Sequence, residues 1–245
     1  MDIGDGNMTL VKILPDIAKQ KVEGKPLIVG VKGVKVWRQW KGKDVLTTQS
    51  AYVVLKGERG IHASRLVNAL IKREGFAVVR DAELIEELKE THGSRVTWQC
   101  RWETQEYGHA VHRIVEWSDD WYITVRLGYV ATCPCAAAMC AQAGEGIPHQ
   151  QRAIMKVTVP WTADPLPVLV DLFLMPRAVM KREQELEWCI QASRDWNQVF
   201  AEDAARRIGE ALGVAGWEEW LVEVEHFESL HEHNMVAVNR RGRFI

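Results

Sequence analysis

An α+β fold is predicted for this chain of 245 residues by the order of its strand-like and helix-like segments. Strands, two helices and strands are followed by a second round of a strand, two helices and strands, whereas a parallel sheet would need strictly alternating units. We therefore expect two modules, each an antiparallel β-sheet with a helix pair, at about residues 26–132 and 150–245. They form one bimodular domain, 26–245, after a polar N-terminal arm at 1–25.

The first module opens with β-branched, glycine-spaced residues at 27–37, which favour a strand that turns at 42–44 into a second strand at 47–55. Apolar residues at helical spacing predict a helix over 61–71 that ends by Gly75. Asp81 is the expected cap of a second helix at 82–89. Alternating patterns predict strands at 95–103, 109–117 and 121–130, with a turn at Asp119-Asp120 between the last two.

The second module has a predicted strand at 153–159, helices at 180–192 and 201–212, and strands at 217–227 and 235–239. The segment from Cys133 to Pro148 is rich in alanine and glycine, and we expect it to be a hinge loop between the modules.

Composition excludes several classes of protein. The formal net charge is -2, so no overall basic field points to nucleic acid. The N-terminus lacks the features of a signal peptide, and no apolar run reaches the roughly 18 residues that span a bilayer. We expect a cytoplasmic protein whose thiols stay reduced and whose partners include neither nucleic acid nor a membrane.

Three cysteines and a histidine lie close together at Cys133, Cys135, Cys140 and His149. Zinc and ferrous iron accept thiolate and imidazole ligands together, and bound zinc lowers the pKa of its water to about 7. The alternative for each cysteine alone is a packed thiol, which we expect for the other two, Cys100 and Cys189.

A second cluster of ligand-type residues is Glu228-Ser-Leu-His231-Glu-His233. If the preceding strand continued, His231 and His233 would share one face of it; the alternative is an exposed polar turn. His226, just before, is expected to be a solvated or satisfied histidine. The charge run at 181–187 by itself indicates a solvated helix face.

Together these residues resemble the type IB GTP cyclohydrolase I family, including its archaeal members, over about 27–240. Four pieces occur in the family's order: Val29-Gly-Val-Lys-Gly-Val-Lys35, Gly60-Ile-His-Ala-Ser-Arg65, Cys133-Pro-Cys135 with His149-Gln-Gln-Arg152, and Phe227-Glu-Ser-Leu-His-Glu-His233.

The resemblance implies a bimodular tunnelling fold, in which sheets of a homotetramer or other homo-oligomer close into a barrel with active sites between subunits. It implies hydrolysis of GTP, or a related purine nucleotide, at C8 with release of formate. The product is a dihydroneopterin triphosphate or cyclic phosphate for folate or methanopterin synthesis. The implied cofactor is a divalent metal, namely zinc, ferrous iron or manganese.

Carried over residue by residue, the resemblance makes Cys133, His149 and His231 metal ligands. Glu228 and His231 would serve as ligands or as acid and base groups. His62 and Arg65 would contact phosphate or ribose at a helix start.

The resemblance also makes Glu185 the carboxylate that selects guanine. A second alignment of the motif places this role on Glu187, and Asp171 stands where the family has another acidic residue. The loop from Cys133 to His149 is longer than the family's.

Two other functions stay open. One is a different tunnelling-fold enzyme for a purine or pterin, with Cys135 or Cys140 as nucleophile. The other is a non-catalytic assembly module stabilised by metal.

Overall fold

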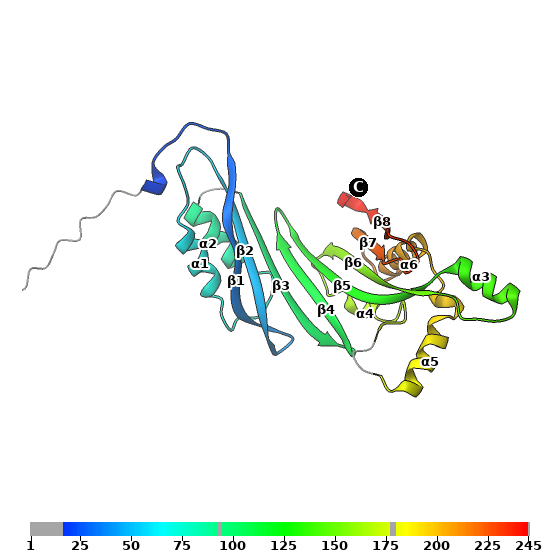
Figure 1. Ribbon diagram of the computed structural model, residues 1–245. Helices are drawn as coiled ribbons and strands as arrows, with labels where there is room; N and C mark the ends of the chain where they lie inside the picture. The colour runs from blue at the N-terminus through cyan, green and yellow to red at the C-terminus, as the bar shows by residue number, and fades with distance from the viewer. Residues whose placement is uncertain (1–16, 93–94, 177–179, 245) are drawn as a thin grey trace, which may run out of the picture.

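The computed structural model describes residues 17–92, 95–176 and 180–244, in which eight strands form one antiparallel sheet in sequence order (Figure 1). The strands are β1 (Leu27–Trp40), β2 (Lys43–Leu55), β3 (Val96–Glu106), β4 (His109–Trp117), β5 (Trp121–Thr132), β6 (Gln150–Pro160), β7 (Trp220–His226) and β8 (Met235–Arg241). Residues 1–16 of the predicted arm lie outside the described residues, while Gln20 and Val22 hydrogen bond to the loop at 57–60.

Helices occupy the connections between strands. The α-helices are α1 (Ala63–Ile71), α2 (Ala82–His92), α3 (Pro134–Ala143), α4 (Leu166–Leu169), α5 (Arg182–Ala192) and α6 (Ala201–Val214). The short 3₁₀ turns are η1 (Ile17–Lys19), η2 (Asp195–Asn197) and η3 (Gly242–Phe244). The α+β class predicted from the sequence is confirmed.

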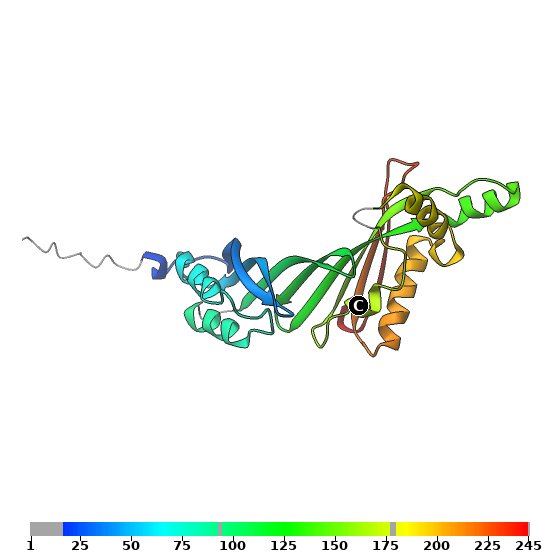
Figure 2. The same cartoon turned by 90° about the horizontal axis from the view of Figure 1, so that it is seen from below.

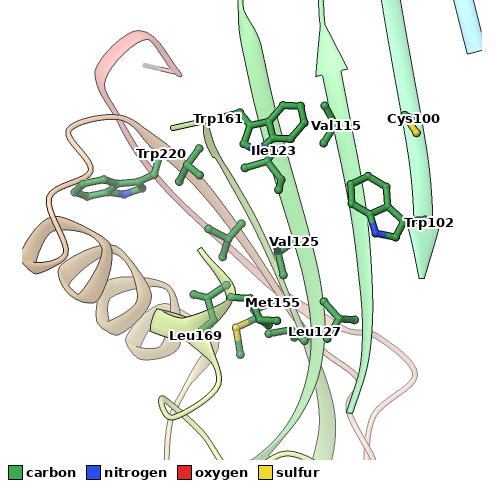
Figure 3. Packing of buried hydrophobic residues seen from close by; sticks show 14 of the residues in the cluster. Cys100, Trp102, Val115, Ile123, Val125, Leu127, Met155, Trp161, Leu169 and Trp220 are labelled. Atoms are coloured by element: carbon green, nitrogen blue, oxygen red, sulfur yellow. The ribbon is translucent and has the colours of Figure 1, made fainter. Parts of the chain in front are cut away.

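One face of the sheet carries a continuous apolar core. Residues that lie opposite one another on neighbouring strands share a face, and the buried positions match across the sheet: Ala51 faces Trp98, and Val115 faces Ile123. Figure 2 shows α1 and α2 at one end of the sheet and α6 at the other. Figure 3 shows the core between them, where Leu169 of α4 packs near Met155 of β6.

Local signals that were read from the sequence explain the first helix pair. Leu66 and Leu70, two of the apolar residues at helical spacing, form the buried side of α1 together with Ala69, whereas Ile71 is exposed. The backbone N–H of Leu84 donates to Asp81 Oδ1 at 3.0 Å, which confirms Asp81 as the cap of α2.

The predicted hinge loop is wrong, because residues 134–143 form α3. Pro134 stands in the first turn, where its fixed φ suits a helix, and Gly144 ends the helix at a φ of 76°. The alanines between them have the highest helix propensity. Two separate sheets are not found either, because β5, the last strand of the first predicted module, pairs directly with β6, the first strand of the second. The boundary between the predicted modules thus falls inside one sheet.

Among the described residues, no helix is both long enough and apolar enough to cross a membrane.

Candidate active site at the ends of β5, β6 and β7

Cys133 and His149 lie opposite each other just after β5 ends and just before β6 begins. The register of the two strands runs to the pair Thr132 and Gln150, and the next backbone N–H, that of Cys133, donates to the carbonyl of His149 at 3.3 Å. Opposite residues of an antiparallel pair point to the same face with neighbouring Cβ atoms. The backbone pairing therefore directs the thiol and the imidazole to the same face of the sheet end.

The polar neighbours of this pair leave metal-binding atoms available. His149 Nδ1 lies 3.2 Å from Ser229 Oγ, which leaves Nε2 as the atom that can bind a metal. Cys133 occupies the N-cap position of α3, and its side chain makes no capping hydrogen bond there. A thiolate and an imidazole with a supporting hydrogen bond fit the donor set of zinc or ferrous iron.

Glu228 joins the same face from β7. The backbone N–H of Phe227 donates to Arg152 O at 2.8 Å, so the pairing of β6 and β7 continues one residue past His226. Glu228 then lies opposite Gln151, and Gln151 Nε2 donates to Glu228 Oε1 at 3.2 Å. Because Gln151 is two residues from His149, all of these side chains share one face of the sheet.

His226 lies beneath this carboxylate and is 1% exposed. Its ring nitrogens lie 2.7 Å from the Tyr129 hydroxyl and 3.2 Å from Gln151 Nε2. Burial lowers the pKa of His226 to about 4, although the Glu228 and Glu202 carboxylates oppose the shift. His226 is thus a satisfied histidine. Gln151 was not predicted as a site residue, although its spacing of two residues from His149 places both side chains on one strand face.

His231 and His233 lie in the connection between β7 and β8, not on a strand. The prediction that they share a strand face is wrong, because β7 ends at His226 and β8 begins only at Met235. Both are exposed, and their rings stack at a centroid distance of 5.3 Å. Within the part of the chain that the structure describes, no three His, Cys, Asp or Glu residues are grouped to hold a metal ion.

The predicted carboxylates of the charge run lie on α5, which is joined to the site through its last turn. Gln150 Nε2 donates to Cys189 O at 2.8 Å and to Ser193 Oγ at 3.0 Å. Glu185 and Glu187 are both exposed on this helix. Asp171 is also exposed, in the turn after α4.

His62 and Arg65 lie at the other end of the molecule, at the start of α1. His62 holds the N-cap position, and Arg65 is exposed in the first turn. A cavity of about 240 Å³ adjoins His62 and is also lined by Lys19 and Lys56. Figure 1 shows α1 and α3 at opposite ends of the sheet, so one chain does not bring the two predicted clusters together.

These residues fall within a match to a known family. The family model described as type I GTP cyclohydrolase FolE2 matches residues 14–237. This chain belongs to that family. The match covers both the Cys133 end and the His62 end of the sheet, so the type I GTP cyclohydrolase resemblance that rested on four short pieces extends over nearly the whole chain.

Curated relatives with the same family name align with this chain over nearly their full lengths. A protein of Pseudomonas putida (strain GB-1) named GTP cyclohydrolase FolE2 is 28% identical over 298 residues, covering 95% of this chain and 97% of the relative. Proteins of the same name from Hahella chejuensis and Xylella fastidiosa (strain 9a5c) are 24% and 25% identical. Those alignments cover 96% and 91% of this chain, and 98% and 97% of the relatives.

Proposed function

We propose that this protein is a metal-dependent GTP cyclohydrolase that opens the guanine imidazole ring at C8 and releases formate, giving a dihydroneopterin phosphate. The observation that carries the proposal is the cross-strand pair of Cys133 and His149 beside Glu228, in a chain that belongs to the type I GTP cyclohydrolase family. The names of the relatives agree with this substrate.

The metal would be held by Cys133 Sγ and His149 Nε2. With a metal on Nε2 the imidazole proton would be on Nδ1, and the hydrogen bond that Nδ1 would donate to Ser229 Oγ orients the ring for this role. His231 remains the proposed third ligand, and it lies in the exposed turn that follows Glu228. When bound, a divalent ion such as zinc, ferrous iron or manganese makes hydroxide available at neutral pH for attack on C8.

The residues of this chain would bind and orient the nucleotide. Glu228 presents a carboxylate beside the metal-binding pair, where it can accept a hydrogen bond from the purine or move a proton. Glu185, exposed on α5, remains the proposed contact that selects guanine. His62 and Arg65, at the N-terminus of α1, would contact phosphate or ribose.

We propose further that the complete site forms between subunits of a homo-oligomer with the bimodular tunnelling fold. Two observations support this. The clusters around Cys133 and His62 lie at opposite ends of one chain (Figure 1). In addition, among the described residues β8 pairs only with β7, and the outer edge of β1 is bonded only near its end, where Trp37 and Gln39 hydrogen bond with residues 75–78, so most of both sheet edges is open for pairing with other copies.

The test is formate release from GTP by purified protein of known metal content, with and without chelator, alongside pterin fluorescence. We expect turnover that the chelator abolishes and that zinc, ferrous iron or manganese restores. Bound metal without turnover under any of the three ions would contradict the proposal. Unfolding on metal removal, with no nucleotide binding, would instead identify a metal-stabilised assembly module.

A further inference from the structure

A buried chain of hydrogen bonds leads from the core to the carboxylate of Glu228. The Tyr129 hydroxyl lies 2.7 Å from His226 Nε2, Gln151 Nε2 lies 3.2 Å from His226 Nδ1, and the same Gln151 nitrogen donates to Glu228 Oε1 at 3.2 Å. Tyr129 and His226 are 0% and 1% exposed, and Gln151 is 7% exposed. These hydrogen bonds thus join β5, β6 and β7 beneath the candidate active site.

The carboxylate determines which way the Gln151 amide points. Turning the amide over would place its carbonyl oxygen against Glu228 Oε1, and two acceptors cannot share a hydrogen bond. The amide nitrogen therefore donates to both of its neighbours. His226 Nδ1 must accept, so the neutral imidazole carries its proton on Nε2, facing the Tyr129 hydroxyl.

Packing of the Tyr129 and His226 rings holds this series of hydrogen bonds in place. The Tyr129 ring stacks on Phe173 with centroids 4.5 Å apart and an angle of 25° between the ring planes. The His226 ring meets the Tyr129 ring edge to face at 5.7 Å. Burial, which lowers the pKa of His226 to about 4, keeps the imidazole uncharged at neutral pH. A protonated ring would direct an N–H of Nδ1 toward the Gln151 amide nitrogen, and the hydrogen bond between these two atoms would be lost.

We propose that Tyr129, His226 and Gln151 are positioning residues for Glu228. His226 Nδ1 holds the Gln151 amide in one orientation, and the amide holds Glu228 Oε1, so that the second carboxylate oxygen stays directed to the substrate. The inference rests on the proposed function for the role of Glu228 toward the nucleotide. It adds that this role depends on the hydrogen bonds that Tyr129, His226 and Gln151 make below the site.

Two substitutions of the same histidine separate positioning from packing. His226→Asn places an amide oxygen near the site of Nδ1 and can still accept from Gln151, whereas His226→Gln reaches toward Tyr129 and loses the acceptor. We expect His226→Gln to lower kcat/KM for GTP at least tenfold and His226→Asn to stay within about threefold of wild type. His112→Gln, on the other face of the sheet, is the matched control and should keep wild-type activity.

A double-mutant cycle on GTP binding shows whether the effect passes through Glu228. We expect Gln151→Ala to weaken GTP binding at least fivefold in the wild-type protein and to change it less than twofold in Glu228→Ala. Equal weakening in both backgrounds, together with equal losses of thermal stability, would mean a structural role only and would overturn the inference.

The tautomer of His226 can be read without any turnover, from its ¹⁵N NMR shifts in selectively labelled protein. We expect the Nε2–H form in the wild type and a mixture of tautomers in Gln151→Ala. An Nδ1–H form in the wild type would overturn the inference even if GTP is hydrolysed. Absence of formate release with an Nε2–H histidine would instead count against the proposed function.

Discussion

The side-chain amide of Asn197 donates a hydrogen bond of 2.7 Å to the backbone carbonyl of Val130. It also donates to Ala192 O at 3.2 Å, and its own oxygen accepts from the backbone N–H of Leu174 at 3.1 Å. These bonds matter because β4 pairs with β5 only as far as Arg126. Beyond that point Asn197 and Leu174 replace the missing strand and support the end of β5, which carries Cys133.

Asn197→Asp should therefore weaken both the fold and the site. A carboxylate cannot donate to the two carbonyls, and it would be buried without a cation, so we expect a loss of about 2–3 kcal/mol in the free energy of unfolding. Denaturant titration measures it. Asn68→Asp, on the exposed side of α1, is the control and should change stability by less than about 0.5 kcal/mol. Similar losses in the two variants would contradict the role of Asn197.

Substitution of Cys133 should remove the metal, whereas substitution of Cys140 should not. Both cysteines are half-buried, but only Cys133 lies opposite His149. We expect Cys133→Ser to lower metal content per chain at least tenfold by elemental analysis after dialysis, and Cys140→Ser to retain it. Full retention of metal by Cys133→Ser would refute the assignment of this ligand.

Acid should destabilise the protein partly through His226. Its folded pKa is about 4, below the ordinary value of 6.5, so the unfolded chain takes up a proton first as the pH falls. Stability should fall between pH 6.5 and 4 by up to about 3 kcal/mol from this group, and should level off below pH 4. Denaturation midpoints from pH 7 to 4 should show a shallower dependence in His226→Asn, and identical slopes would contradict the expectation.

Substitution of Arg113 should destabilise the fold more than substitution of most other charged residues. Its guanidinium is 0% exposed and bonds to Glu106 at 2.6 Å and Asp164 at 3.0 Å. Burial opposes the charge on Glu106, but hydrogen bonds from Thr104 and Arg113 outweigh it and lower the pKa of Glu106 to about 2.

Arg113→Met should therefore cost about 3–5 kcal/mol of unfolding free energy, since the two carboxylates lose their buried cation. Lys41→Met removes the half-exposed cation that contacts the same two acids, and it should cost at most about 1 kcal/mol. Thermal melts of both variants check this order, and a reversed order would show that the buried bridge is not the main contact.

Mixed oligomers should test whether two chains build one site. Cys133→Ala and Arg65→Ala are each expected to be inactive, the first in metal binding and the second in nucleotide binding. Subunits of the two variants, unfolded together and refolded, should regain measurable formate release, because some sites would then draw both intact residues from different chains. No regain, with normal mixed oligomers by native mass spectrometry, would place each site within one chain.

Local chemistry was enough to predict most elements of this fold. Residues such as Leu66 and Leu70 at helical spacing, Asp81 as a cap, and the Asp119-Asp120 turn act over a few positions of the chain, so the sequence determined them directly. The same holds for Cys133 and His149 as candidate ligands, because their residue types alone suit a metal. Helix α3 replaces the predicted loop because its alanines favour a helix, and the glycine that follows them is its C-cap rather than part of a flexible segment.

Only the tertiary structure decided which of these residues meet. The registers of β5, β6 and β7 are continued past the strand ends by the backbone bonds from Cys133 to His149 and from Phe227 to Arg152, which direct Cys133, His149 and Glu228 to one face. Register is a property of strand pairing that no single segment contains. The same pairing buried His226 under Gln151, which converted an ordinary histidine into a neutral hydrogen-bond acceptor. Residue types thus determined the available chemistry, and packing over long sequence separations determined which groups can act together.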